Sequence, residues 1–347
     1  MGKQLGGKVS QSNIEKYERS KQWVGEKFSN LEKTEMNIPF RALPKLILSQ
    51  MFGRKKRQPK ENIPVIPFNK TQFLSSSENM KFIWYGHSAL LMRMNAQTIL
   101  IDPMLSLDAA PIAPFSVKRF NDVSPILIDE FPEIDLMILS HDHYDHLDYK
   151  SIVRLKSKVK KYYVALGVAR HLIEWGVPPD DITEFDWWET TIFEEIQITF
   201  TPSRHFSGRG LKDRFKGLWG GWVFKSSNEN IWFSGDGGRG KHFKEIGEKL
   251  GPFDFAFMEC GQYNILWPLI HLFPEESVQS ALSAKALKIM PVHWGSFTLS
   301  DHKWNDPVKR FVSESQQNSI PYLTPKIGES ITPHDHSESP HWWEVID

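Results

Sequence analysis

The sequence predicts an α/β protein. Short apolar runs with strand character precede residue 140, and from residue 149 onward strand-like runs alternate with helical segments. Several of these strands end in a histidine or an aspartate, at the place where a sheet presents side chains to a site. A chain of 347 residues, 40% of them hydrophobic, can bury a sizeable core. We therefore expect one large domain with extensions.

The composition excludes several classes of protein. Lysine plus arginine and aspartate plus glutamate both total 42, so the net charge is zero and no basic field indicates a nucleic-acid partner. A single cysteine, Cys260, excludes an internal disulfide framework, and its apolar neighbours indicate an inert buried thiol. The sequence shows neither a secretory signal nor an apolar run of about 20 residues, the length that spans a bilayer. The expected location is the cytoplasm, including the inner face of a membrane.

Residues 1–76 are predicted to form an N-terminal helical extension. Apolar residues between positions 14 and 31 fall near helical spacing, and a second apolar stretch covers residues 40–52. This stretch is followed by a basic cluster, residues 54–57. One interpretation is a packing helix with a solvated basic end. The other is an interfacial element, residues 40–57, whose apolar face enters lipid while its cations attract anionic headgroups.

The main domain is expected to cover residues 77–331. Its first strands are predicted at 81–85, 89–94, 98–103 and 134–139, and residues 104–133 are predicted to be a long loop because of their prolines. The later segments alternate as helices 149–156, 168–175, 242–250 and 274–287 and strands 161–166, 182–185, 192–202, 219–225, 230–234, 254–258 and 289–292. Residues 332–347 are polar and are predicted to be a loose C-terminal tail.

The segment after the strand at 134–139 has the composition of a metal site. It places His141, His143, Asp145 and His146 in the pattern H-x-H-x-D-H. Imidazole nitrogen and carboxylate oxygen are the ligands that zinc and similar divalent ions take in proteins. The sheet holds the strand end rigidly, and the turn after it allows these side chains to converge. One histidine alone would more often be structural, but four candidate ligands at this spacing predict a metal.

Three further strand ends carry candidate ligands, namely His205, Asp236 and His293. Seven ligands exceed the need of one four-coordinate zinc and suit two metals. Two divalent ions can share a bridging hydroxide and stabilise both the entering and the leaving oxygen of a hydrolysis. The pattern therefore predicts a hydrolase with two divalent metal ions. Zinc is the first expectation, and the ligand types also admit manganese or iron.

The order of these ligands resembles the metallo-β-lactamase superfamily over about residues 78–330. The resemblance implies an αβ/βα four-layer sandwich, in which two sheets pack face to face with helices outside. It implies two metal sites joined by a bridging carboxylate, with the ligands His141, His143 and His205 for one metal, Asp145, His146 and His293 for the other, and Asp236 as the bridge. Asp102 would orient a ligating histidine from behind. His87, in a Gly-His-Ser turn, fits either a turn residue or a neighbour of the site.

A closer resemblance is to the N-acylphosphatidylethanolamine-hydrolysing phospholipase D subgroup. It is carried by longer motifs, among them Asp186-Trp187-Trp188-Glu189, Thr201-Pro202-Ser203-Arg204-His205, Leu218-Trp219-Gly220-Gly221-Trp222 and His293-Trp294-Gly295-Ser296-Phe297. The resemblance implies that His271 and the pair Gln262-Tyr263 lie at the mouth of the site and meet the substrate phosphate or its leaving group. It also places residues 40–57 where the subgroup carries a membrane-contacting region. Residues 206–210 and 261–270 depart from the subgroup.

The predicted function is metal-dependent hydrolysis of a phosphodiester, with an N-acylphosphatidylethanolamine-type phospholipid as the expected substrate and a metal-bridging hydroxide as the nucleophile. Asp145 and His271 are the expected catalytic residues. Two alternatives stay open. A soluble metallo-lactonase, or another phosphodiesterase acting on a small phosphorylated substrate, would not need the apolar and basic residues 40–57. A metal-dependent binding protein without activity would be indicated by a missing ligand, but all seven positions are filled.

Overall fold

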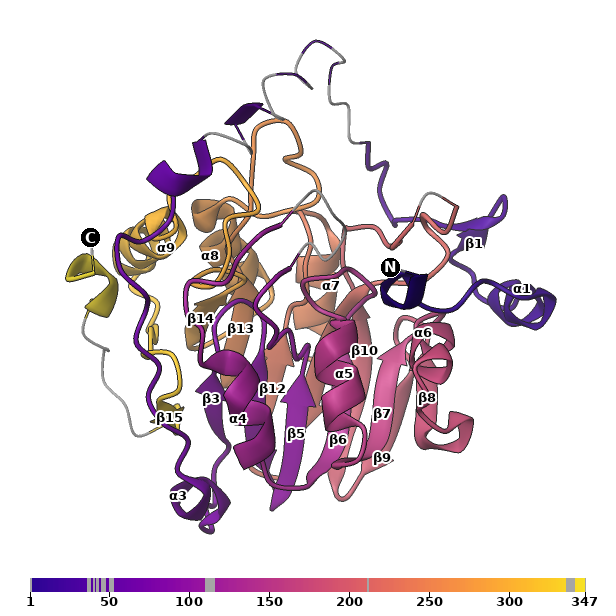
Figure 1. The fold of residues 1–347 in the computed structure, drawn as a ribbon, viewed down its shortest axis with the longest axis horizontal. Coiled ribbons are helices and arrows are strands. Elements are labelled where there is room, and N and C mark those ends of the chain that lie inside the picture. Colours follow the sequence, from indigo (N-terminus) through magenta and orange to yellow (C-terminus); the bar gives the residue numbers. More distant parts are fainter. Residues whose placement is uncertain are drawn as a thin grey trace.

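The fold is a sandwich of two β-sheets. The computed structural model describes residues 2–35, 53–109, 116–210, 212–334 and 341–346, together with residues 39, 41, 44, 48 and 49. Within this part the two sheets pack face to face, and helices cover their outer faces (Figure 1). The predicted four-layer α/β sandwich is therefore confirmed. Half of the proposed interfacial element, residues 40–57, lies outside the described residues.

The first sheet has, among the described residues, seven strands in the order β15-β3-β4-β5-β6-β7-β8. Pairing is antiparallel from β15 to β5 and parallel from β5 to β8. The strands are β3 (Lys81–Trp84), β4 (Leu90–Met94), β5 (Gln97–Ile101), β6 (Ile134–Leu139), β7 (Val159–Ala165), β8 (Ile182–Phe185) and β15 (Ser330–Ile331). Almost every residue of β6 is buried, as expected of a strand covered on both faces.

The second sheet has six strands in the described part of the chain, in the order β14-β13-β12-β11-β10-β9. The strands are β9 (Thr190–Phe193), β10 (Ile196–Pro202), β11 (Gly220–Lys225), β12 (Asn230–Phe233), β13 (Phe255–Glu259) and β14 (Ile289–Val292). Aromatic side chains join the two sheets. The ring of Phe82 lies 4.9 Å from that of Phe257, and the ring of Phe185 lies 5.3 Å from that of Trp222. The core thus fills the interior between the sheets and continues to the faces that the helices cover.

The helices form the outer layers. Beside the first sheet lie α4 (Ser124–Glu130), α5 (Tyr149–Leu155) and α6 (Ala169–Glu174). Beside the second lie α7 (His242–Lys249), α8 (Pro274–Ser283) and α9 (Asp306–Gln317), with α8 against β13 and α9 against β14. α5 starts directly after the histidine-rich segment because the Asp148 carboxylate caps it, accepting hydrogen bonds from the amides of Lys150 and Ser151.

Two helices differ from the prediction. α4 lies inside residues 104–133, which were predicted to be a loop, and α9 covers a segment for which no element was predicted. Both helices have a proline in the first turn, Pro125 and Pro307. A proline there loses no helical hydrogen bond, because the first amides of a helix have no partner within it. The prolines of 104–133 were interpreted as loop signals, although one of them marks a helix start.

The N-terminal extension is only partly helical. α1 (Gln11–Tyr17) ends well before residue 31, and a hairpin of β1 (Trp23–Val24) and β2 (Lys27–Phe28) follows. The apolar spacing therefore serves an aromatic cluster rather than a long helix, with ring centroids 5.0–5.3 Å apart among Tyr17, Trp23 and Phe28. The domain bounds 1–76, 77–331 and 332–347 stay predictions.

The end of the chain is not a loose tail over residues 341–346. Trp342 and Trp343 are buried, and the ring of Trp342 stacks 5.6 Å from that of Trp294. The polar composition of the segment predicted a tail, but two tryptophans are enough to hold it against the domain, because each buries a large apolar area.

The described part of the basic cluster is divided between core and surface. Arg57 is 7% exposed, and its guanidinium donates to the carbonyls of Ser49 and Ser300 and pairs with Asp301. Lys55 and Lys56 are exposed. None of the described helices has the length and apolar character needed to cross a membrane.

Buried His242 predicts acid destabilisation of the fold. Burial, reinforced by the Arg204 cation, lowers the pKa of His242 to about 3. An unfolded histidine takes up its proton near pH 6.5, so the stability contributed by the neutral ring is lost as pH falls from about 6.5 towards 3, at up to about 1.4 kcal/mol per pH unit. We expect the urea midpoint of metal-free protein to fall less steeply over this range in His242→Gln. His341→Gln is the control, because its ring is paired with the exposed Glu344 rather than with a buried group, and equal slopes in all three proteins would contradict the assignment.

Candidate metal centre

The candidate ligands come together at one end of the sandwich. They lie in the loops that follow β6, β10, β12 and β14. Three residues at this end, His87, Asp102 and His293, hold left-handed backbone conformations with φ of 54°, 41° and 69°. Such conformations are costly for residues other than glycine and concentrate at functional sites, where the surrounding structure enforces them. The surrounding structure therefore holds the backbone of these three residues in conformations that fix where their side chains lie.

The first group of ligands is formed by three histidines. The Nε2 atom of His141 lies 2.9 Å from Nδ1 of His143, and Nε2 of His205 lies 3.1 Å from the same Nδ1. His141 and His205 each have a partner at the opposite nitrogen, the Ser140 hydroxyl and the Ile270 carbonyl. If their Nδ1 atoms carry the protons, both Nε2 atoms present lone pairs, and His143 has only one proton to share between them. A cation suits this arrangement of nitrogens.

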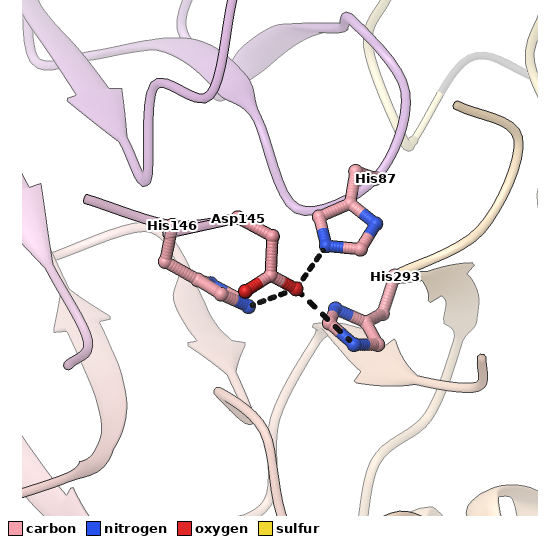
Figure 2. A group of neighbouring side chains, drawn as sticks. All are labelled: His87, Asp145, His146 and His293. Atoms are coloured by element: carbon pink, nitrogen blue, oxygen red, sulfur yellow. Dashed lines mark hydrogen bonds and ion pairs between the residues drawn. The ribbon is translucent and has the colours of Figure 1, made fainter. Parts of the chain in front are cut away.

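The second group contains Asp145, His146, His293 and also His87 (Figure 2). The Asp145 Oδ2 atom accepts a hydrogen bond of 2.8 Å from His87 Nε2 and lies 3.7 Å from His146 Nε2 and 4.0 Å from His293 Nε2. His87, for which the sequence left two interpretations open, thus lies beside the site. His293 Nε2 has no hydrogen-bond partner among the described residues.

Asp236 lies between the two groups. Its Oδ2 atom is 3.1 Å from His146 Nε2 and 4.0 Å from His205 Nε2, and its Oδ1 atom is 3.2 Å from His293 Nδ1. One carboxylate therefore contacts histidines of both groups. All seven side chains that the sequence singled out as metal ligands lie in this one cluster.

Buried groups behind the cluster fix the orientation of the rings. The carboxylate of Asp102 is fully buried and accepts hydrogen bonds from His146 Nδ1 at 2.7 Å and from the Ser140 amide at 2.8 Å. A ring that donates from Nδ1 has its Nε2 lone pair directed to the opposite side. Asp142 anchors the loop after β6 to its neighbours, because its carboxylate accepts hydrogen bonds from the Gly208 amide at 2.7 Å and from the Arg170 guanidinium.

The electrostatics of the cluster favour neutral histidines and ionised aspartates. Burial lowers the pKa values of His141, His205 and His293 well below the usual range, so these rings stay neutral, which is the form that binds metals. His146 behaves differently: burial would lower its pKa, but Asp236, Asp145 and Asp102 outweigh that effect and raise it. The three carboxylates thus attract a positive charge to this point, which a divalent cation would satisfy in place of the proton.

Glu259 is a member of the site that the sequence did not reveal. Its carboxylate, in β13, is 1% exposed and accepts hydrogen bonds from His271 Nδ1 at 2.9 Å and from the Leu272 amide at 2.8 Å. The His271 ring lies 5.1 Å from the His205 ring and 5.3 Å from the His293 ring. Glu259 interrupts the apolar run Phe255–Cys260, and a lone carboxylate in a buried strand was the available signal. Burial raises the pKa of Glu259 to about 7.

Two residues expected at the mouth make structural bonds instead. The Gln262 side chain donates to the His293 and Phe297 carbonyls, and its oxygen accepts from the amides of Leu299 and Ser300. The Tyr263 hydroxyl donates to Asp306. The resemblance assigned both residues to the substrate, but their polar atoms hold together the loop after β14.

Phe206 and Arg214 border the cluster on another side. The Phe206 ring lies 4.4 Å from the His143 ring, and the Arg214 guanidinium lies 4.8 Å above Phe206. In the described part of the chain, no ion pair joins Arg214 to a carboxylate. The loop that departs from the subgroup therefore adds an aromatic ring and a cation beside the first group of histidines.

The fold and the histidine and aspartate clusters together define a metal-dependent hydrolase. The chain belongs to the metallo-β-lactamase superfamily, because residues 97–294 match the model of the Beta-lactamase superfamily domain. It is 33% identical over 323 residues to an uncharacterized protein of Mycobacterium tuberculosis, covering 92% of this chain and 86% of that one. It is 30% identical over 285 residues to N-acyl-phosphatidylethanolamine-hydrolyzing phospholipase D 1 of Caenorhabditis elegans, covering 77% of this chain and 79% of that one.

Solved structures show the same fold. Igni18, a metallo hydrolase from the archaeon Ignicoccus hospitalis, matches with a TM-score of 0.56 at 19% identity, covering 73% of this chain and 97% of that one. The isothiocyanate hydrolase from Delia radicum gut bacteria matches with a TM-score of 0.56 at 19% identity, covering 72% and 98%. At this level of identity the likeness establishes the architecture alone.

Proposed function

We propose that the protein is a dinuclear metallohydrolase that cleaves a phosphodiester, with an N-acylphosphatidylethanolamine-type phospholipid as its substrate and phospholipase D chemistry as its reaction. The observation that carries the proposal is Asp236, a carboxylate in contact with histidines of two adjacent groups. The relative from Caenorhabditis elegans, named for this reaction, supports the substrate.

The proposed ligands follow from the two groups. His141, His143 and His205 would hold the first metal, Asp145, His146 and His293 would hold the second, and Asp236 would serve both. When bound, two divalent ions, zinc in the first instance, lower the pKa of water to give a nucleophile at neutral pH and stabilise charge on phosphoryl oxygens. His87 has a separate task in this scheme: its hydrogen bond to Asp145 fixes the rotation of that carboxylate.

His271 is the proposed donor of a proton to the departing alkoxide. A ring nitrogen of His271 lies within 4.8 Å of ligand atoms of His205 and Asp236, so it reaches the space where the substrate would react. Burial alone would lower the pKa of His271, but its hydrogen bond to Glu259 and the charge of that carboxylate raise it. The ring therefore retains a proton more readily than a solvent-exposed histidine, as a general acid requires.

Two residues beside the first group of histidines, Arg214 and Phe206, support an anionic substrate. Phosphate carries negative charge, and Arg214 places a cation beside Phe206. Phe206 itself offers an apolar surface next to His143. A phosphodiester with an apolar substituent matches this pair better than a small polar ester does.

The proposed function is tested by mass spectrometry of products. Metal-loaded protein is incubated with vesicles that contain N-acylphosphatidylethanolamine, beside His143→Ala and the exposed-histidine control His334→Ala. We expect phosphatidic acid and N-acylethanolamine from the parent and from His334→Ala, and none from His143→Ala. No lipid product from a parent that binds two metals per chain would reject this substrate and favour a soluble small phosphorylated one.

Peripheral membrane contact through residues 40–57 is part of the proposal. Because Arg57 is buried, exposed Lys55 and Lys56 are the described cations of the cluster that can attract anionic lipid. A basic residue near an anionic surface contributes about 1 kcal/mol, so Lys55→Glu/Lys56→Glu is expected to weaken cosedimentation with anionic vesicles by more than tenfold. Lys244→Glu/Lys249→Glu, on α7, is the matched control. Equal binding by the parent and both double variants would remove membrane contact from the proposal.

A further inference from the structure

The segment 28–34 of the N-terminal extension is hydrogen-bonded to the main chain of His205. The Asn30 side chain donates from Nδ2 to the His205 carbonyl at 2.8 Å and accepts at Oδ1 from the His205 amide at 3.0 Å. The same Oδ1 accepts from the Trp219 indole at 3.1 Å. One amide side chain thus satisfies both main-chain groups of a candidate ligand, as a neighbouring strand would.

These hydrogen bonds lie beyond the end of β10, where strand pairing no longer supports the chain. β10 ends at Pro202, so His205 lies three residues beyond the last strand pairing. Buried main-chain groups need hydrogen-bond partners, and His205 is 1% exposed. Its ring is held separately, by the Ile270 carbonyl at Nδ1. Asn30 therefore sets the position of the His205 backbone, and Ile270 sets the rotation of its ring.

Residues next to Asn30 extend the contact to the loop that carries Asp236. The Glu32 carboxylate accepts from the Lys241 amide at 2.7 Å. Arg204, the neighbour of His205, donates to the Lys33 carbonyl at 2.6 Å and to the Thr34 hydroxyl at 2.9 Å. The segment thus lies across both the loop of His205 and the loop of Asp236.

The start of the chain makes a second connection, to the histidine-rich loop. The Arg209 guanidinium donates to the Gln4 carbonyl and also to the carbonyls of Asp142 and Leu147, at 2.7 and 2.8 Å. The chain can approach this closely because residue 6 is glycine. A Cβ atom on Gly6 would lie 2.0 Å from Nδ1 of His171, and its φ of 74° also favours glycine.

We infer that the N-terminal segment 2–35 is a built-in part of the metal centre, and that Asn30 is a positioning residue which holds His205 at its ligand position. The inference rests on the proposed metal centre. It separates residues 2–35 from residues 40–57 in function: the first belong to the site, whereas membrane contact is proposed for the second. Deletion of the whole extension would therefore remove metal binding together with any membrane contact.

The experiment titrates Zn²⁺ and Co²⁺ into metal-free full-length protein and follows calorimetry and the Co²⁺ absorption spectrum. Asn30→Ala removes both bonds to His205. Asn30→Asp keeps the size of the side chain but replaces the donor facing the His205 carbonyl with an oxygen. Asn13→Ala is the matched control, because Asn13 lies in the same extension and bonds only to the Ser10 cap among the described residues.

We expect both Asn30 variants to weaken one of the two metal-binding steps by 10–100-fold, the range for lost support behind a ligand, and to alter the Co²⁺ spectrum of that step. Asn13→Ala should bind both metals as the parent does. Parent-like affinities and spectra in folded Asn30→Asp would overturn the inference while leaving the metal centre intact. A parent that binds no metal would overturn the proposed centre, and the inference with it. Thermal unfolding of each metal-free variant separates lost metal affinity from lost folding.

Discussion

Replacing Asp236 with alanine is expected to abolish hydrolysis and to reduce the metal content of the protein in the same step. Its carboxylate contacts His146 and His293 and lies 4.0 Å from His205, so removing it takes a negative charge from beside both groups of histidines. The loss should exceed the 10–100-fold that removal of a supporting group costs. Metal analysis after dialysis and turnover of the proposed substrate are the two measurements.

Asp236→Asn refines this result, because the amide keeps the volume but loses the negative charge. Without that charge the site attracts a divalent cation less strongly, so this variant should also lose metal. Exposed Asp180→Ala is the control and should retain both metals. Full turnover by Asp236→Ala would contradict the bridging role and would require a different pair of ligand sets.

Substitution of His271 or of its partner Glu259 should lower turnover while leaving the metals bound. General acid catalysis contributes about 10²- to 10⁴-fold, so kcat of His271→Ala should fall within that range. Glu259→Gln should lower kcat less, because the amide oxygen can still accept one of the two hydrogen bonds that Glu259 accepts from His271 and Leu272. Metal content, KM and kcat are measured on each variant.

The control for Glu259→Gln is Glu276→Gln, because Glu276 likewise accepts a hydrogen bond from a main-chain amide, that of Phe273, near the same segment. It should leave kcat unchanged. A lost metal in His271→Ala would mean that His271 is a ligand rather than a proton donor. Unchanged kcat in both His271→Ala and Glu259→Gln would remove the pair from the catalytic scheme.

Features with short sequence signals were predictable. The motif from His141 to His146 lies within six positions and follows an uninterrupted apolar strand, so its chemistry and its place in the sheet can be read together. His205, Asp236 and His293 repeat the same local arrangement of a strand followed by a polar residue. The sandwich followed from family resemblance, and the order of strands within each sheet was not predicted, because strand pairing depends on contacts far apart in sequence.

The rest of the site depends on long-range contacts for which the sequence carries no local sign. Asn30 and His205 are 175 positions apart, and an asparagine in a polar segment gives no indication of its partner. Glu259 was hidden in an apolar strand, although a buried carboxylate there needs a partner. Gln262 and Tyr263 were assigned from resemblance alone, and their hydrogen bonds to neighbouring loops overrule that assignment.

The stacked tryptophans at the end of the chain give the protein an internal optical reporter. Trp294 directly follows His293, and its ring stacks with those of Trp342 at 5.6 Å and Trp304 at 6.4 Å. Any shift of His293 on ligand binding is transmitted to this group of fluorophores through a single peptide bond. We therefore expect intrinsic emission to change with occupancy of the centre, without a label and without a substrate, and Trp342→Phe would show whether this indole carries the signal.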